Sequence, residues 1–192
     1  SLGQKLKTKS IRVAEADALD SDEVACVANG TDLIFNGIYA TYNTSLMQAC
    51  LDVGAHYIDL RSNAVEGPGV PWNETIDAQL KMDEKFKLAG LTAVPCMGVS
   101  PGWANMMACY MIDQMDTIDS VICRNIDWID STDLLAPIAP RNVFYLWLGP
   151  PYPTCMVNGL PQKVELLESE EEFEFPAPAG KQKVYTFTQD PE

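Results

Sequence analysis

The first two thirds of the chain alternate short apolar runs with segments of helical periodicity. Four apolar runs have the length of strands: residues 11–19, 32–40, 56–60 and 91–97. Three segments between them are predicted helices: residues 20–28 and 43–53 place apolar residues at helical spacing, and residues 74–89 form a polar helix that ends at Gly90. Strand and helix joined by short links predict right-handed crossovers, and therefore an α/β fold with a doubly wound parallel sheet. The run DLIFNGIYA at 32–40 does not alternate, which is typical of a strand covered on both faces.

Residues that begin and end helices support this order. Asp20 with Glu23 has the spacing of a capping box, and Ser45 with Gln48 has the same spacing. Gly54 follows the segment at 43–53 and can adopt the left-handed conformation in which helices end. These signals predict helices that begin and end near the limits of the periodic segments.

The stretch VPCMGVSPGWANM, from residue 94, predicts a strand that runs directly into the strongest helix of the chain. Ser100 is the predicted N-cap, and Pro101 suits the first helical position because proline lacks the amide hydrogen that would be unpaired there. Apolar residues then recur at helical spacing: Trp103, Met106, Met107, Tyr110, Met111 and Met115. We interpret this stripe as a core-facing surface.

From Ile118 the pattern changes to short runs separated by prolines and glycines. The segment IDSVICRNIDWI alternates, and further strand-like runs follow at residues 143–148, 163–167, 172–175 and 183–187. In LLESEEEFEF the alternation of Glu and Phe predicts one solvated and one buried face. These signals predict antiparallel strands that form part of an α+β domain.

Composition excludes several classes of partner. The 192 residues carry a formal net charge of −14, and the sequence pI is near 4.3. Nucleic acids are bound mainly through Lys and Arg, so this balance argues against a nucleic-acid partner and against an anionic membrane surface. No apolar run reaches the length of a membrane span and no signal sequence opens the chain, so a cytoplasmic location is expected.

The cysteines and the single histidine do not form a metal-binding pattern. No C-x-x-C pair occurs and His56 is the only histidine, so the sequence offers no zinc ligand set at the usual spacing. Cys50 and Cys109 fall on apolar helix faces, and Cys96 falls in an apolar strand. We interpret these cysteines as small core residues in a reducing compartment, and His56 as structural.

A glycine-rich phosphate-binding turn does not occur in the sequence. Parallel α/β domains that bind dinucleotides begin with a strand, a G-x-G-x-x-G turn and a helix. Gly98 and Gly102 are spaced G-x-x-x-G, which is not that pattern. The chain is therefore either another kind of parallel α/β domain or one whose glycine-rich turn lies upstream of Ser1.

Several separated motifs point to one family. The stretch TDLIFNGIYATYNTSLMQACLDVGAHYIDL is followed, at the family's spacing, by DEKFKLAGLTAVPCMGVSPGWANMMA. Together they resemble the saccharopine dehydrogenase-like family, which includes saccharopine reductases, lysine dehydrogenases and carboxynorspermidine synthases. The resemblance covers residues 11–115, and VNGLPQKVE and FEFPAPAGKQKVYTFTQDPE are similar to the start of the family's second domain. The saccharopine-forming branch typically has Asp where this chain has Ser100, which leaves the substrate open.

The resemblance implies an NAD(P)-dependent oxidoreductase that acts on the CH–NH group of an amino-acid-derived substrate. It implies that residues 1–117 are the C-terminal portion of a Rossmann-like dinucleotide-binding domain, and residues 118–192 part of an α+β substrate or dimerisation domain. The first strand, the glycine-rich turn and the second strand are then expected upstream of Ser1, so the sheet should be incomplete. We expect this fragment to be inactive, and its exposed sheet edge to pair with another chain, as in a homodimer.

Ligands of doubly wound sheets bind outside the carboxyl ends of the strands, and this rule selects the candidate residues. The candidates for contact with NAD or NADP are Asp17, Ala18, Asn36, Gly37, Ile38 and Tyr39. By analogy with the fold, Asp17 and Ala18 would flank the adenine. Gly37 allows close backbone approach, and Asn36 can hydrogen-bond ribose or phosphate. A simple turn explains Asn36-Gly37 equally well.

Catalytic and substrate candidates follow the later strands. The catalytic candidates are Asp59 and Ser100, and the candidates for contact with an amino-acid-like substrate are Arg61, Gly98, Gly102 and Asn105. Asp59 could orient an ammonium group or assist proton transfer, but a structural ion pair or cap explains it at least as well. Ser100 begins a predicted helix, where a carboxylate or cofactor oxygen is favoured. We do not expect Ser100 to be a nucleophile, because no base lies nearby in the sequence.

Two other function classes compete with the oxidoreductase. One is a non-catalytic Rossmann-like module that uses its exposed sheet edge for protein association. The other is an α/β hydrolase, which the absence of G-x-S-x-G and of a histidine at the carboxyl rim disfavours. A strand followed by G-x-G-x-x-G upstream of Ser1 would separate the oxidoreductase from the association module.

Overall fold

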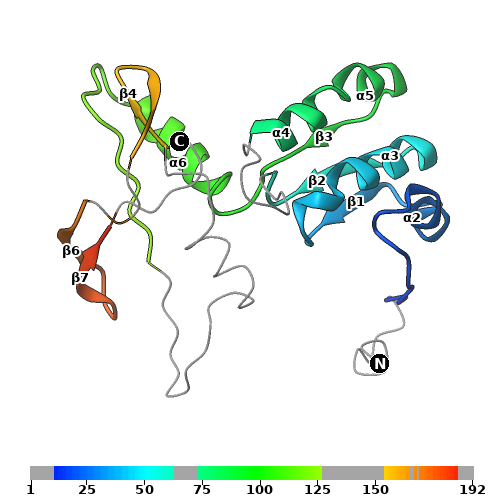
Figure 1. Cartoon of the computed structure of the whole chain (residues 1–192), viewed down its shortest axis with the longest axis horizontal. Helices are drawn as coiled ribbons and strands as arrows, with labels where there is room; N and C mark the ends of the chain where they lie inside the picture. Colours follow the sequence, from blue (N-terminus) through cyan, green and yellow to red (C-terminus); the bar gives the residue numbers. More distant parts are fainter. Residues whose placement is uncertain (1–10, 63–72, 127–153, 165–166, 168, 186–192) are drawn as a thin grey trace. The chain divides into compact units, whose positions relative to one another are not determined.

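The computed structural model describes residues 11–62, 73–126, 154–164, 167 and 169–185 (Figure 1). By their contacts these residues form two compact units, the first ending at Gly98 and the second beginning at Val99. The domain boundary that we expect between residues 117 and 118 remains a prediction.

A three-stranded parallel sheet forms the centre of the first unit. Its strands are β1 (Leu33–Asn36), β2 (His56–Asp59) and β3 (Ala93–Val94), in the order β1-β2-β3. Asn36 pairs with Asp59 in the register of β1 and β2, so these strands end level with each other. The predicted α/β fold with a parallel sheet is confirmed, and the carboxyl ends of its strands form one rim.

Helices pack against the sheet, and the predicted signals at Asp20 and Gly54 are confirmed as helix ends. In the described part of this unit they are α2 (Ser21–Ala28), the 3₁₀ helix η1 (Ala40–Tyr42), α3 (Asn43–Val53), α4 (Asn73–Leu80) and α5 (Asp83–Ala89). The Asp20 carboxylate caps α2 by accepting hydrogen bonds from the amides of Asp22 and Glu23, at 2.9 and 3.1 Å. Helix α3 ends at Gly54, whose φ of 75° is left-handed.

The core lies between these helices and one face of the sheet. Its buried cluster consists of Val24, Leu46, Met47, Ala49, Cys50, Tyr57, Met82 and Phe86. Burial raises the pKa of the Cys50 thiol to about 12, and the predicted core position of this residue is confirmed. Leu33 and Phe35 are exposed, because α3, α4 and α5 all join the same cluster on the other face. The expectation that β1 is covered on both faces is therefore wrong.

Two predicted elements of the first unit differ in the structure. Residues 11–19 form no strand, since no neighbouring strand in the described structure completes a ladder with them. The Arg12 side chain instead donates to the carbonyl of Val27 in α2 at 2.8 Å. The predicted helix at 74–89 is two helices, because the chain turns at Met82, whose amide bonds to the Gln79 carbonyl at 2.9 Å. The turn directs the Met82 side chain into the core.

The predicted capping box of Ser45 and Gln48 is also wrong. Helix α3 already begins at Asn43, so Ser45 lies inside its first turn and cannot cap it. The Gln48 side chain donates to the carboxylate of Asp52, one turn further along, at 2.8 Å. The predicted range of the helix, 43–53, is that of α3, so only its capping interaction was predicted wrongly.

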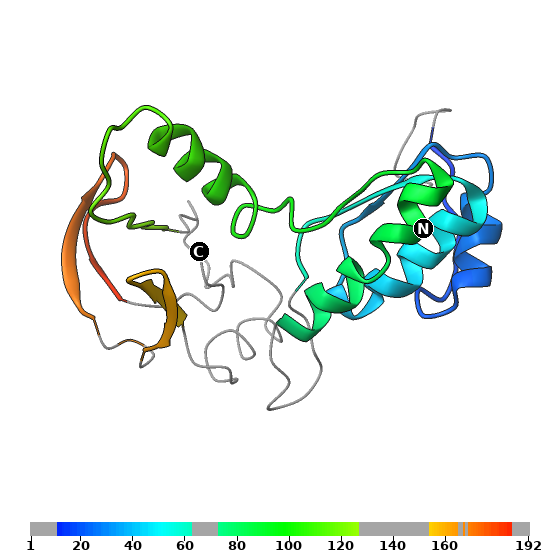
Figure 2. The same ribbon diagram turned by 90° about the horizontal axis from the view of Figure 1, so that it is seen from above.

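The second unit contains helix α6 (Trp103–Ile112) and two antiparallel hairpins, whose gold and orange-red ribbons can be followed in Figure 2. The hairpins pair β4 (Thr154–Val157) with β5 (Leu160–Lys163) and β6 (Glu171–Phe175) with β7 (Gly180–Val184). Antiparallel pairing is confirmed for this part of the chain. The predicted strand at 172–175 lies in β6 and the run at 183–187 overlaps the end of β7, whereas β4 and most of β5 were not predicted. In β6, Phe175 is buried, Phe173 is half-buried and the glutamates are exposed, as the alternation of Glu and Phe predicts.

Helix α6 begins later than predicted. Gly102 precedes it with a φ of 123°, and because only glycine adopts this φ readily, the helix does not extend back to Ser100 and Pro101. The amide of Gly102 donates to the side-chain oxygen of Asn105 at 2.9 Å. The apolar stripe of α6 is exposed, so the prediction that it faces the core is wrong for the described residues. The exposed Cys109 is likewise not a core residue.

Two predicted strands in the last third are not found as predicted, and a third cannot be compared. Residues 118–126 alternate in sequence, but they form no strand and their larger apolar side chains are exposed. Of the run at 163–167 the structure describes residues 163, 164 and 167, and of these only Lys163 lies in a strand, as the last residue of β5. The run at 143–148 lies outside the described residues. Over the ranges that the structure describes, no helix is long and apolar enough to cross a membrane.

Replacing Phe86 by Ala should lower the free energy of unfolding by about 3–5 kcal/mol, because this large side chain is 3% exposed within the core cluster. Leu88→Ala on the same helix is the matched control. Leu88 is 88% exposed, so its truncation should change the free energy of unfolding by less than about 0.5 kcal/mol. Urea unfolding followed by circular dichroism measures both, and equal effects would contradict this core.

Candidate functional site

Asn36 ends β1 with its side chain turned into the protein. Its Nδ2 donates to Asn43 Oδ1 at 2.7 Å and to the Tyr57 hydroxyl at 3.2 Å. Its Oδ1 accepts from the amide of Ile38 at 3.0 Å. Both polar atoms are therefore engaged inside the chain, and the geometry favours the turn interpretation of Asn36-Gly37 over direct contact with ribose or phosphate.

Asp59 ends β2 and joins it to the loop that follows β3. Its Oδ2 accepts from Gln79 Nε2 at 2.7 Å, and its Oδ1 accepts from the amide of Cys96 at 2.8 Å. Its backbone carbonyl accepts from the amide of Met97, also at 2.8 Å. The carboxylate is thus held between a helix and a loop, which favours a structural role over proton transfer.

Asn43 and Gln79 connect these two strand ends. Asn43 Nδ2 donates to the carbonyl of Arg61 at 2.9 Å and to Gln79 Oε1 at 3.0 Å. The four side chains that form this buried polar relay are each at most 3% exposed: Asn36, Asn43, Gln79 and Asp59. The relay ties α3, α4 and the ends of β1 and β2 into one hydrogen-bonded group at the rim.

Sequence reasoning missed Asn43 and Gln79 because their partners lie far away in the chain. Gln79 lies in a segment that reads as a polar surface helix, and Asn43 reads as a helix start. One signal was available, since Gln79, Met82 and Phe86 have the i, i+3 and i+7 spacing of a helix face. All three are buried, so the polar residue on that face required an internal partner.

Tyr57 lies beneath the relay and is kept neutral by its surroundings. Burial raises the pKa of its hydroxyl far above the usual range. The hydrogen bond from Asn36 lowers this pKa, whereas the neighbouring Asp59 carboxylate raises it. The side chain is 1% exposed. Tyr57 therefore acts as a neutral hydrogen-bonding group of the core.

Cys96 follows β3 in a backbone conformation that is unfavourable for a residue with a side chain. Its φ of 61° is left-handed. The bonds of the Cys96 and Met97 amides to Asp59 hold this conformation, and Cys96 Sγ donates to the buried Ser62 hydroxyl at 2.8 Å. Backbone strain of this kind persists only where neighbouring groups fix it, and it clusters at functional sites.

The other candidates of the first unit lie in two places. Gly37, Ile38 and Tyr39 form an exposed loop directly after β1. Arg61 follows β2 and contributes its carbonyl to the relay. Asp17 and Ala18 lie in a turn before α2, where Asp17 Oδ1 accepts from the Leu19 amide at 2.9 Å. The rim therefore gathers residues 36–39, 59–61 and 96–97, whereas residues 17 and 18 belong to the start of α2.

The remaining candidates follow β3. Gly98 is the last residue of the first unit, and Ser100, Gly102 and Asn105 belong to the second. Asn105 has a defined role there, because its side chain bonds to the Gly102 amide at the start of α6. His56 begins β2, at the opposite end from the rim, and its Nδ1 accepts from the amide of Thr92 at 3.0 Å. The structural interpretation of His56 is thereby supported.

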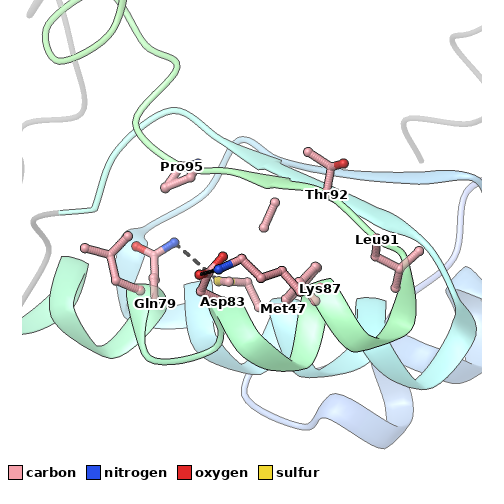
Figure 3. A pocket seen from close by; sticks show the side chains of 10 residues that line it. Met47, Gln79, Asp83, Lys87, Leu91, Thr92 and Pro95 are labelled. Carbon is pink, nitrogen blue, oxygen red and sulfur yellow. Dashed lines mark hydrogen bonds and ion pairs between the residues drawn. The ribbon is translucent and has the colours of Figure 1, made fainter.

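A small pocket of about 170 Å³ lies between β3 and helices α4 and α5 (Figure 3). Its lining is mostly apolar: Met47, Gln79, Leu80, Asp83, Phe86, Lys87, Leu91, Thr92, Ala93 and Pro95. Gln79 belongs to both the pocket and the relay, and its Nε2 also lies 3.5 Å from the Met47 sulfur. Lys87 pairs with Asp83 at the pocket. Among the described residues, no group of His, Cys, Asp and Glu could hold a metal ion.

Comparison with known proteins connects this geometry to a dehydrogenase family. The family model of the saccharopine dehydrogenase NADP binding domain matches residues 1–94. Carboxynorspermidine synthase of Vibrio cholerae is 31% identical over 124 residues, which cover 60% of this chain and 30% of that protein. Carboxyaminopropylagmatine dehydrogenase of Synechocystis sp. is 32% identical over 120 residues, 59% of this chain and 29% of that protein.

The match is partial in length. The chain spans about 30% of the length of these curated relatives. A solved structure of apo saccharopine dehydrogenase (L-Glu forming) from Saccharomyces cerevisiae is 17% identical with a TM-score of 0.42, covering 53% of this chain and 20% of that one.

Replacing Tyr57 by Phe should flatten the alkaline decline in stability. Because the native state raises the pKa of Tyr57, this stabilisation is present below about pH 10 and is lost as the pH rises further. Above about pH 10 the free energy of unfolding of the wild type should fall by about 1.4 kcal/mol per pH unit more than that of Tyr57→Phe. Urea titrations over this range measure the difference, with Tyr110→Phe on the exposed face of α6 as the control. Parallel slopes for wild type and Tyr57→Phe would refute the effect.

Proposed function

Residues 1–94 belong to the saccharopine dehydrogenase NADP-binding family, and on this premise we propose that the chain is part of an NAD(P)-dependent oxidoreductase acting on the CH–NH group of an amino-acid-derived substrate. The observation that carries the proposal is the family match over the residues that form the parallel sheet and the rim at the ends of β1 and β2. The cofactor of this family is NAD or NADP, which supplies hydride chemistry when bound.

The names of the relatives support a substrate class. Carboxynorspermidine synthase and carboxyaminopropylagmatine dehydrogenase are both named for amines that bear a carboxyl group. An enzyme that reduces an imine to such an amine must bind one carboxylate and hold the carbon–nitrogen bond against the nicotinamide. We propose a substrate of this kind, a small carboxylated imine or its amine.

The exposed loop after β1 fits one side of a dinucleotide. Gly37 is exposed, and a Cβ built on it would meet only the ring of Phe35, at 3.4 Å and beyond. A ligand can therefore approach the backbone of residues 37–39 closely. The phosphate-binding glycine-rich turn of such domains does not occur in this sequence, so these residues would hold only part of the cofactor.

The other residue assignments are proposals of unequal support. Arg61 at the rim could pair with a substrate carboxylate. Asp17 and Ala18 are proposed beside the adenine, and Gly98, Ser100, Gly102 and Asn105 beside the substrate, on the resemblance of their motifs alone. For Asp59 the two internal hydrogen bonds favour a positioning role over proton transfer.

We also propose that this chain is cytoplasmic and forms a homodimer. In the described sheet β1 is an edge strand, and Leu33 and Phe35 are exposed on the uncovered face beside it. An exposed edge next to exposed apolar side chains favours pairing with a further chain.

Fluorescence titration of the full-length protein with NADPH and NADH tests the proposed function. At least one nucleotide should bind saturably, with a dissociation constant between about 1 μM and about 1 mM. Gly37→Asp should weaken binding at least about tenfold, because it places a carboxylate at the loop proposed to contact the anionic cofactor. Leu88→Asp, at an exposed position on α5, is the control and should bind like wild type.

Two results would reject the assignment. Absence of binding of both nucleotides at millimolar concentration would exclude the oxidoreductase. Equal affinities of wild type and Gly37→Asp would exclude the loop after β1 as a cofactor contact.

A further inference from the structure

We propose that Asn43, Gln79 and Asp59 are positioning residues that set the shape of the ligand rim before any ligand binds. The relay reaches from the end of β1 to the loop after β3, and its side chains meet the backbone at Ile38, Arg61 and Cys96. This inference rests on the proposed function in one respect, namely that the rim faces a nucleotide or its substrate.

Backbone groups at two ends fix the direction of the hydrogen bonds that link Asn43, Gln79 and Asp59. At one end the Arg61 carbonyl can only accept, so Asn43 must present Nδ2 there and to Gln79 Oε1. Gln79 then presents Nε2 to Asp59 Oδ2. At the other end the Cys96 amide can only donate, so Asp59 Oδ1 must accept.

A third backbone group fixes the branch toward β1. The Ile38 amide donates to Asn36 Oδ1, so Asn36 must present Nδ2 to Asn43 Oδ1. Rotation of any of the three side-chain amides, those of Asn36, Asn43 and Gln79, by half a turn would therefore bring two donors or two acceptors together. The relay has a single self-consistent arrangement, and in it Asp59 accepts at both oxygens.

The loop after β3 depends on this arrangement. Cys96 holds a left-handed φ of 61°, which is unfavourable for a residue with a Cβ and must be imposed by its neighbours. The carboxylate of Asp59 binds the Cys96 amide, and the backbone carbonyl of the same residue binds the Met97 amide, each at 2.8 Å. Loss of the Asp59 acceptor should release this loop while the hydrophobic cluster stays intact.

A variant that breaks the hydrogen-bond pattern and a second variant that restores it distinguish a positioning role from a general contribution to stability. Asp59→Asn replaces one acceptor by a donor, so one buried pair of donors results in any orientation of the amides. Adding Gln79→Glu restores the pattern, because a carboxylate at position 79 can accept both from Asn43 and from the new side-chain amide at position 59. The double variant keeps the number of buried carboxylates and the side-chain volumes nearly unchanged.

The chain supplies a matched control for this swap. Gln48 donates to Asp52 at 2.8 Å on the exposed surface of α3, the same pair of residue types as Gln79 and Asp59. Asp52→Asn, alone and with Gln48→Glu, therefore makes the identical chemical change away from the rim. Neither control should alter the loop after β3 or ligand binding.

The experiment measures hydrogen exchange of the peptide that spans residues 92–99 and the NADPH dissociation constant in the full-length protein. Asp59→Asn should accelerate exchange of the Cys96 and Met97 amides about tenfold and weaken NADPH binding about tenfold, the effect of one unmatched buried donor. Asp59→Asn with Gln79→Glu should return both quantities to within about threefold of wild type. The inference is overturned if Asp59→Asn leaves the exchange of these amides unchanged, or if the double variant folds without restoring it.

Two further outcomes are decisive. If Asp59→Asn does not fold, Gln79→Met is used instead. This variant removes the hydrogen bonds of residue 79 to Asn43 and Asp59 and leaves the bond between Asp59 and Cys96. If Gln79→Met changes neither the exchange of the Cys96 and Met97 amides nor the NADPH affinity, the inference is refuted. If the wild type binds neither NADPH nor NADH, the proposed function fails, whereas acceleration and repair of exchange at Cys96 would still support the relay as the device that shapes the rim.

Discussion

The carboxylate of Asp59 is the interaction on which the rim of this molecule depends. It lies at the end of the central strand, almost without contact with solvent, and accepts from Gln79 on one side and from the Cys96 amide on the other. A buried carboxylate is tolerated only when its oxygens are hydrogen-bonded, so Asp59 requires one donor from helix α4 and one from the loop after β3. Because both donors are present, the ends of the strands are connected to this helix and this loop.

The same constraint explains how the helices are placed. Asn43 is the first residue of α3 and Gln79 lies near the end of α4, and each side chain must reach the relay while Met47 and Phe86 fill the core beside it. Apolar burial supplies most of the favourable free energy, but it is not directional. The hydrogen bonds of the relay determine which turn of each helix faces which strand, and they leave the exposed loop of residues 37–39 in a defined place at the proposed cofactor site.

Sequence reasoning succeeded where the signals are local. Helix α2 follows from its Asp20 cap, α3 from its apolar periodicity and its terminal Gly54, and the parallel sheet from the alternation of strands and helices. It failed where structure depends on distant partners. Residues 11–19 have strand-like composition without a neighbouring strand, and the buried role of Gln79 depends on Asp59, 20 residues earlier in the chain. The family resemblance supplied the cofactor class, which no local pattern contained.

The most direct test of the account is the exchange of side-chain amide protons, measured by NMR in the ligand-free protein. If the relay exists as described, the Asn43 and Gln79 side-chain amide protons exchange with water at least about a hundredfold more slowly than those of Asn29, which is exposed at the end of α2. If the side-chain amide protons of Asn43, Gln79 and Asn29 exchange at similar rates, the rim is not held by a buried relay.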